Sequence, residues 1–168
     1  MSDRQESLWR TTGHLDPESV EVPSKERLKE GAIAVIECPQ KIPCDPCSQN
    51  CPIGAINMSG INGIPEVDYE KCTGCSICAQ YCPGLAIFLL DCTPDQGCNL
   101  TLPYEFSLPE IGEEVDGLNR KGEVVATGVV QNTITQEESA GDTSTVTVRI
   151  PEANVNGVRN IRRQNDQR

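Results

Sequence analysis

The sequence predicts an α+β protein, with a core built from an internal two-fold repeat and a small all-β module after it. A cysteine-rich motif ends in Cys82-Pro83. Sliding the sequence back by 31 positions superimposes this motif on a second one, which ends in Cys51-Pro52. Beyond residue 101 cysteine disappears, and residues 144–150 alternate apolar and polar side chains with the period of two that is typical of a β-strand.

The spacing of the cysteines predicts iron–sulfur chemistry. The second motif reads C-x2-C-x2-C-x3-C-P, in which three thiolates bind one cube and the fourth serves another. Thiolate sulfur is a soft, electron-rich ligand that suits iron–sulfide cubes. We therefore predict two [4Fe-4S] clusters with crossed ligation. The expected ligands are Cys38, Cys44, Cys47 and Cys82 for cluster I, and Cys51, Cys72, Cys75 and Cys78 for cluster II.

One ligand of cluster I depends on the repeat offset alone. The offset maps Cys72 onto Lys41, which cannot bind iron, and the nearest spare thiol is Cys38. We expect Cys38 to replace the missing ligand through a longer loop. The alternative is a three-iron cluster, held by Cys44, Cys47 and Cys82 alone. Iron per chain and the spin-resonance signal of the oxidised protein distinguish the two.

Zinc and disulfides are the other common uses of clustered cysteines. Zinc ribbons use two C-x2-C pairs with a long spacer, which this motif does not follow. Disulfide frameworks are typical of secreted chains, whereas residues 1–6 are polar and show no signal-peptide pattern. The two cysteines outside the motifs, Cys92 and Cys98, are expected as free thiols in a loop. A mononuclear site that borrows ligands from another chain is the alternative for them.

The pattern of the chain predicts its elements in order. We expect an arm with a short helix (1–31), a dicluster domain (32–101), a β module for subunit contact (102–161) and a frayed tail (162–168). Ser24 is the expected cap of the short helix. In the dicluster domain, a strand at residues 33–36 should pair with residues 86–90, and residues 55–58 and 64–67 should form a hairpin. The β module should begin with an extended linker at 102–109, followed by strands at 114–118, 123–132 and 144–150.

Charge and hydropathy restrict the partners. The net charge is −11 and the middle of the chain is strongly acidic, so nucleic acid is not an expected partner. The acidity suits either solubility or docking to a basic face of a partner protein. No apolar run approaches the ~20 residues that cross a bilayer, and we expect a cytoplasmic protein. The only histidine, His14, is expected as a solvated loop residue, and Trp9 as the anchor of an arm that packs on a partner.

The two cysteine motifs also carry a family resemblance. The segments Cys44–Pro52 and Cys72–Pro83 resemble the motifs of bacterial-type dicluster ferredoxins, and the resemblance covers residues 32–92. It implies a ferredoxin-like fold, two four-iron clusters and one-electron transfer at low potential. The chain departs from the ferredoxin pattern at Lys41, at the spacing of Cys38 and in its long flanks.

The whole chain, including residues 102–106 and 112–130, is similar to small iron–sulfur subunits of flavin-dependent amino-acid dehydrogenase complexes, the proline and hydroxyproline type. This second resemblance implies a hetero-oligomer in which larger flavoprotein subunits do the chemistry, often with a further small iron–sulfur protein. We expect an electron-transfer subunit that is not an enzyme on its own and has no catalytic residues. The alternatives are a free ferredoxin that serves several redox partners, and a scaffold whose clusters only stabilise the fold.

Overall fold

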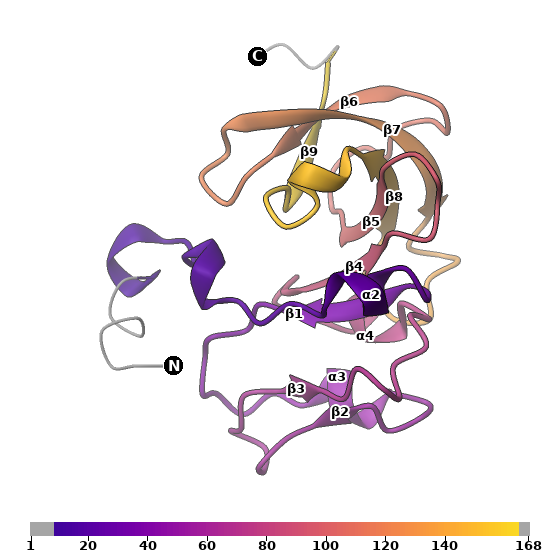
Figure 1. The fold of residues 1–168 in the computed structure, drawn as a ribbon. Helices are drawn as coiled ribbons and strands as arrows, with labels where there is room; N and C mark the ends of the chain where they lie inside the picture. Colours follow the sequence, from indigo (N-terminus) through magenta and orange to yellow (C-terminus); the bar gives the residue numbers. More distant parts are fainter. Residues whose placement is uncertain (1–8, 165–168) are drawn as a thin grey trace.

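The computed structural model describes residues 9–164 and is dominated by one antiparallel sheet (Figure 1). The strand order in this sheet is β1-β4-β5-β8-β7-β6-β9, and β2 and β3 form a separate pair. The strands are β1 Ile33–Ile36, β2 Ile56–Asn57, β3 Glu66–Val67, β4 Ile87–Asp91, β5 Cys98–Pro103, β6 Glu114–Leu118, β7 Val124–Ile134, β8 Thr145–Ile150 and β9 Asn160–Arg163. The helices are α2 Lys25–Leu28, α3 Pro46–Gln49 and α4 Ile77–Gln80, with 3-10 turns η1 Pro17–Ser19 and η2 Glu152–Asn154. The mixture of helix and strand that the sequence predicts is confirmed.

The local elements of the repeat form as the sequence predicts. β1 pairs with β4, so that Ile33 lies opposite Leu90, and β2 pairs with β3 as a hairpin. The predicted cap is also present, because the hydroxyl of Ser24 accepts a hydrogen bond from the Arg27 N–H at the start of α2. Figure 1 shows α4 beside β4, and α3 beside β2.

Strands β1 and β4 are buried on both faces and separate two apolar cores. Because successive side chains of a strand point to opposite faces, Val35 and Leu90 enter the larger core, whereas Ala34 and Leu89 enter the smaller one. The smaller core also contains Cys47 and Cys78 from α3 and α4, together with Ile56, Ala79 and Ile87. The larger core continues through β5, β8 and β7. The cysteine motifs therefore lie on one face of the sheet edge, and the C-terminal strands extend from it.

The expected linker at residues 102–109 is wrong in its first part. Its first two residues belong to β5, which pairs with β4 on one side and β8 on the other. Leu100 and Leu102 are completely buried there. Asn99, Thr101 and Pro103 weaken the strand pattern in the sequence, and the burial of the alternate leucines overrides them. The sheet runs without a break across residue 101, and the division into domains stays a prediction.

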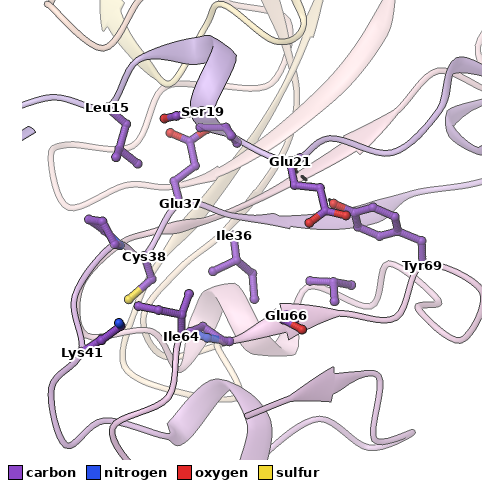
Figure 2. Close-up of a pocket in the computed structure, with 14 residues that line it drawn as sticks. Leu15, Ser19, Glu21, Ile36, Glu37, Cys38, Lys41, Ile64, Glu66 and Tyr69 are labelled. Atoms are coloured by element: carbon purple, nitrogen blue, oxygen red, sulfur yellow. Dashed lines mark hydrogen bonds between the residues drawn. The ribbon is translucent and has the colours of Figure 1, made fainter. Parts of the chain in front are cut away.

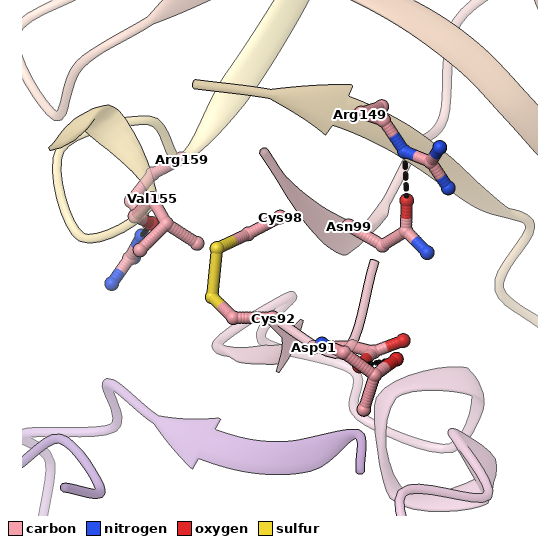
Figure 3. The surroundings of a disulfide bond; sticks show 8 residues. Asp91, Cys92, Cys98, Asn99, Arg149, Val155 and Arg159 are labelled. Atoms are coloured by element: carbon pink, nitrogen blue, oxygen red, sulfur yellow. Dashed lines mark hydrogen bonds between the residues drawn. A yellow bond between two sulfur atoms is a disulfide. The ribbon is translucent and has the colours of Figure 1, made fainter. Parts of the chain in front are cut away.

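Cys92 and Cys98 are not free thiols, because they form a disulfide (Figure 3). The register of β4 and β5 places Asp91 opposite Asn99, so the next opposed pair is Cys92 and Cys98. Their Cα atoms are 4.3 Å apart, close to the separation of a directly opposed pair in an antiparallel ladder. The bond could not be expected from the sequence pattern, which indicates a loop where β5 begins.

Replacing both Cys92 and Cys98 by alanine is expected to lower the free energy of unfolding by about 2 kcal/mol, because the loss of a short cross-linked loop frees the unfolded chain. Denaturant titration of the iron-loaded protein measures this loss, and iron content should not change, since neither residue is an expected ligand. Wild-type protein treated with a reductant is the control. Alkylation of both residues in the folded, unreduced protein would show that the bond is absent.

The C-terminal segment is ordered further than the sequence predicts. Residues 162 and 163, expected to begin a frayed tail, belong to β9, which pairs with β6. Two ion pairs support this strand: Arg162 with Asp116 at 2.9 Å, and Arg163 with Glu113 at 2.7 Å. Residues 165–168, the rest of the expected tail, lie outside the described residues, as do residues 1–6, from which the absence of a signal peptide was inferred.

Candidate iron–sulfur site

Four cysteines line one small cavity between the two halves of the repeat. They are the four residues expected to bind cluster II: Cys51, Cys72, Cys75 and Cys78. Three come from the second motif, and Cys51 comes from the end of the first, just after α3. Ala34, Ile56 and Leu89 close the cavity with apolar side chains. Four thiols around a largely apolar space are a donor set that fits a four-iron cluster.

The other four cysteines, Cys38, Cys44, Cys47 and Cys82, lie close enough for their charges to interact. Burial, together with the nearby Cys82, Cys44 and Cys38, raises the pKa of the Cys47 thiol to about 11. Burial, followed by Cys82 and Cys38, also raises the pKa of Cys44. The structure therefore brings Cys82, from the second motif, to the thiols of the first. This is the exchange between halves on which the sequence prediction for cluster I depends.

Across residues 9–164, no three histidine, cysteine, aspartate or glutamate side chains converge on a point that could hold a single metal ion. The thiolates of a cube bind different iron atoms, so they stand farther apart than the ligands of one ion. The assignment of the eight cysteines as ligands stays a prediction.

Backbone N–H groups donate hydrogen bonds to the sulfur atoms in a pattern that repeats. The N–H of Ala55 donates to Cys51 Sγ at 3.2 Å, and the N–H of Ala86 donates to Cys82 Sγ at 3.4 Å. These two bonds are related by the offset of 31 residues. Such bonds favour the thiolate form and help to set the potential of a cluster. The sequence aligns these alanines but does not reveal their hydrogen bonds.

Two side-chain contacts hold the second motif in place. Arg27 of α2 donates to the carbonyl of Tyr69 at 2.9 Å and to the carbonyl of Cys72 at 2.8 Å. The N–H of Ala34 in β1 donates to Cys72 Sγ at 3.4 Å. The short helix before β1 therefore fixes the first cysteine of this motif, a role that sequence reasoning missed because Arg27 lies 45 residues away.

Gly74 is the point where this cysteine loop meets β1. It has a φ of +66°, and a Cβ atom at this position would collide with the backbone carbonyl of Ala32. The aligned position in the first repeat is Pro43, which cannot adopt a positive φ. The two loops therefore cannot share one backbone path, consistent with the different position of the first cysteine in each motif.

Replacing Gly74 by alanine is expected to disturb cluster II, because the loop must leave β1 or strain its backbone. Iron and sulfide content should fall after anaerobic reconstitution, and stability should fall by more than the roughly 1–2 kcal/mol of a left-handed residue. Gly54→Ala is the matched control. Gly54 has a φ of +61° but no atom within 4 Å of an added Cβ. Equal losses in the two variants would show that the contact with Ala32 has no role.

Cys38 lies in the loop after β1, on the wall of a cavity of about 330 Å³ (Figure 2). Figure 2 shows Cys38 and Lys41 at one end of this cavity, with Tyr69 at the other. Leu15 of the N-terminal segment also lines it. Cys38 is half-buried and is not in a disulfide. The longer loop predicted for the first repeat thus leaves its thiol available for ligation.

The residue before Cys38 anchors this loop to the C-terminal strands. Glu37 accepts hydrogen bonds from Arg120 at 2.5 and 2.8 Å and from Arg159 at 2.5 Å. All three side chains are at most 8% exposed. The arginines are 83 and 122 residues away in sequence, so no local pattern could have identified this cluster. It ties the loop of Cys38 to the β6–β7 turn and to the start of β9.

Comparison with known proteins supports the cluster chemistry. A family model described as a 4Fe-4S binding domain matches residues 65–88, which indicates that this segment binds a 4Fe-4S cluster. An uncharacterized ferredoxin of Methanocaldococcus jannaschii is 48% identical over 44 residues, 26% of this chain and 28% of its own. The pyruvate synthase subunit PorD of Methanothermobacter marburgensis is 46% identical over 46 residues, 27% of this chain and 51% of its own.

A third relative belongs to an ion-translocating oxidoreductase complex of Methanosarcina acetivorans. This subunit is 40% identical over 58 residues, 34% of this chain and 20% of its own. The chain spans between 20% and 51% of the length of these three relatives. The relatives are ferredoxins or subunits of oxidoreductase complexes, which supports a general role in electron transfer. No solved structure matches the chain. Across residues 9–164, every helix is too short or too polar to span a bilayer.

Proposed function

We propose that this chain is the electron-transfer subunit of a multi-subunit oxidoreductase and carries two [4Fe-4S] clusters. The observation that supports this most directly is the cavity lined by Cys51, Cys72, Cys75 and Cys78, which joins thiols from both motifs. A cluster with four thiolate ligands has no open coordination site, so it supplies one-electron transfer. The chain holds the thiols, excludes water with the apolar side chains of the smaller core, and donates N–H groups to the sulfurs.

The partner in this proposal is a flavoprotein dehydrogenase of the amino-acid type, with a further small iron–sulfur subunit. This partner rests on the resemblance to subunits of such complexes that the sequence suggests at residues 102–106 and 112–130. A flavin accepts two electrons from a substrate, and two clusters on one chain accept them singly. The acidic surface, with a net charge of −11, favours a partner with a basic face.

Native purification tests this proposal. We expect the chain to elute with a flavin-containing subunit, and anaerobic addition of the amino-acid substrate to bleach the cluster absorbance of the complex. Elution as a flavin-free monomer would contradict the flavoprotein partner. Salt-sensitive exchange with several redox partners would then indicate a free ferredoxin. Clusters that cannot be reduced within the physiological range would contradict electron transfer itself.

The cytoplasmic location stays a prediction, and the disulfide bears against it. Stable disulfides are rare in reducing compartments, whereas Cys92 and Cys98 are bonded here and both are buried. Trapping thiols with an alkylating reagent at the moment of cell lysis shows whether this bond exists in the cell. A fully reduced pair in the native host would agree with the cytoplasm.

A further inference from the structure

A cavity of about 670 Å³ lies where the N-terminal segment, the end of β1 and the β6–β7 turn meet. Figure 1 shows the backbone of these segments, with the N-terminal segment in indigo and the β6–β7 turn in orange. Small-molecule sites typically enclose about 300–1,000 Å³ and occur at junctions between structural units. The volume of this hollow, which is open to solvent, falls within that range. None of the functions proposed above uses it.

The lining is cationic, although the protein is strongly acidic. Arg10, Arg120 and Arg159 line the cavity, and among its described lining residues Glu37 is the only acid. With the histidine neutral, three arginines and one glutamate leave a charge of +2, in a chain whose net charge is −11. Buried charges in proteins are normally paired. Arg10 is exposed, so one charge of the excess faces solvent and the other belongs to the buried Arg120, Arg159 and Glu37. Both charges favour an anion in this cavity.

The buried part of this charge is not fully compensated. Glu37 is shared by Arg120 and Arg159, so one positive charge lies among side chains that are at most 8% exposed. Burial lowers the pKa of Arg159 despite the opposing effect of Glu37. In the described part of the chain, two buried side-chain nitrogens have no hydrogen-bond partner, Arg159 Nη2 and Trp9 Nε1. Both belong to residues that line this cavity, and the two nitrogens themselves are covered by neighbouring atoms.

The rest of the lining suits the body of an organic molecule. Leu15, Leu85 and Leu118 contribute apolar side chains. Flat cationic groups are also present, since the guanidinium of Arg10 lies over the Trp9 ring and that of Arg159 over the Phe88 ring, each 5.1 Å from the ring centre. Guanidinium planes stack on aromatic rings and form forked hydrogen bonds with phosphate. The cavity therefore combines anion recognition with an apolar, stacking surface.

We propose that this cavity binds an organic phosphate of mononucleotide size, with its phosphate at Arg120 and Arg159 and its ring against the leucines. A phosphate monoester carries a charge of about −1.5 to −2 at pH 7, so it can pair with the buried excess charge and with the exposed Arg10 together. Free nucleotides and flavin mononucleotide share this chemistry. The two-cluster assignment is not needed for binding.

The position of the site connects it to cluster I. Ala86, whose N–H donates to Cys82 Sγ, lines the cavity, as do Glu37 and Pro39 on either side of Cys38. A ligand here would lie beside the segments that hold two expected ligands of cluster I. This connection rests on the proposed function, because it requires Cys38 and Cys82 to bind that cluster.

Titration of the full, cluster-loaded chain tests the site directly. The probes are flavin mononucleotide, adenosine monophosphate and inorganic phosphate, with calorimetry as the common measurement. Trp9 is the only tryptophan of the chain, so its emission reports binding of the two probes that do not absorb there. We expect at least one organic phosphate to bind with a stoichiometry of one, and inorganic phosphate to bind at least tenfold more weakly because it lacks the apolar body.

Arg120→Gln is the variant that removes the proposed phosphate contact while Arg159 still pairs with Glu37. We expect it to weaken binding by about tenfold or more, the effect of losing a hydrogen bond to a charged group. Arg162→Gln is the matched control. It removes the same charge from a side chain that is 51% exposed and does not line the cavity. Arg10→Gln, on the Trp9 ring, is the second test variant if Arg120→Gln fails to fold.

Three results would overturn the proposal. They are the absence of saturable binding of either nucleotide, equal affinity in Arg120→Gln and Arg162→Gln, and inorganic phosphate binding as tightly as both organic probes. Adenosine monophosphate and flavin mononucleotide identify the ring that the site prefers. Iron content, measured on each sample, distinguishes a failure of the binding proposal from a failure of the proposed electron-transfer function. Two reducible clusters without binding contradict the site alone, and binding without iron contradicts the electron-transfer role alone.

Discussion

Replacing Cys51 by alanine is expected to damage the cluster that the second motif binds, although Cys51 belongs to the first. Its thiol lines the same cavity as Cys72, Cys75 and Cys78, and a cube with three protein ligands loses iron readily. Iron should fall below the roughly eight atoms of two cubes. The neighbouring N–H of Ala55, which donates to Cys51 Sγ, would lose its acceptor. Anaerobic reconstitution followed by iron and sulfide analysis measures the loss.

A variant that cannot assemble cluster II serves as the starting protein for testing which cluster each remaining cysteine binds. The variant Cys75→Ala/Cys78→Ala should retain about four iron atoms, those of cluster I. Adding Cys51→Ala to it should change neither the iron content nor the spin-resonance signal, because Cys51 serves the cluster already lost. Adding Cys82→Ala should remove or convert the remaining cluster. The opposite outcome would mean that each motif binds its own cluster without exchange.

The eighth ligand is tested in the same background. If Cys38 completes cluster I, Cys38→Ala should lower the iron content from about four atoms per chain and produce a three-iron signal. If cluster I holds three irons from the start, the starting material already gives that signal, and Cys38→Ala changes nothing. Lys41 occupies the repeat-related position and cannot replace the thiol.

The sequence predicts the local parts of this protein well. The β1–β4 pairing and the β2–β3 hairpin follow from short apolar runs separated by turns and cysteine loops, whose signals lie within a few residues. The cysteine motif and its repeat also predict that Cys51 and Cys82 exchange clusters, and this ligation stays a prediction. The structure places Cys51 in the cavity of the second motif and makes Cys82 a neighbour of Cys47. Repetition in sequence carries this long-range information.

Contacts between segments without a repeat relation could not be predicted. β5 contains Asn99, Thr101 and Pro103, and only its pairing with β4 and β8 makes it a strand. The disulfide follows from that pairing and was missed with it. The ion cluster around Glu37 brings together three distant positions. In each case tertiary burial determines the outcome, and single-sequence patterns do not record it.

Replacing Glu37 by alanine is expected to have the largest effect on stability of any single change outside the cysteines. It would leave Arg120 and Arg159 together without an anion, and both side chains are at most 8% exposed. Removing one partner of a buried ion pair costs about 3–5 kcal/mol, a large part of the roughly 5–15 kcal/mol that holds a domain folded. The loop of Cys38 would also lose its anchor, so cluster I should be lost first on heating.

The effect of Glu37→Ala must be separated from that of a lost surface charge. Asp116→Asn is the matched control, because Asp116 pairs with Arg162 at 2.9 Å but that arginine is 51% exposed. Such pairs contribute at most about 1 kcal/mol. Combining Glu37→Gln with Arg120→Gln should recover part of the loss relative to Glu37→Gln alone, since only one buried charge then lacks a partner. If Glu37→Ala costs no more than Asp116→Asn in denaturant titrations, water or another anion must compensate these arginines. The buried ion cluster would then not be what fixes the loop of Cys38.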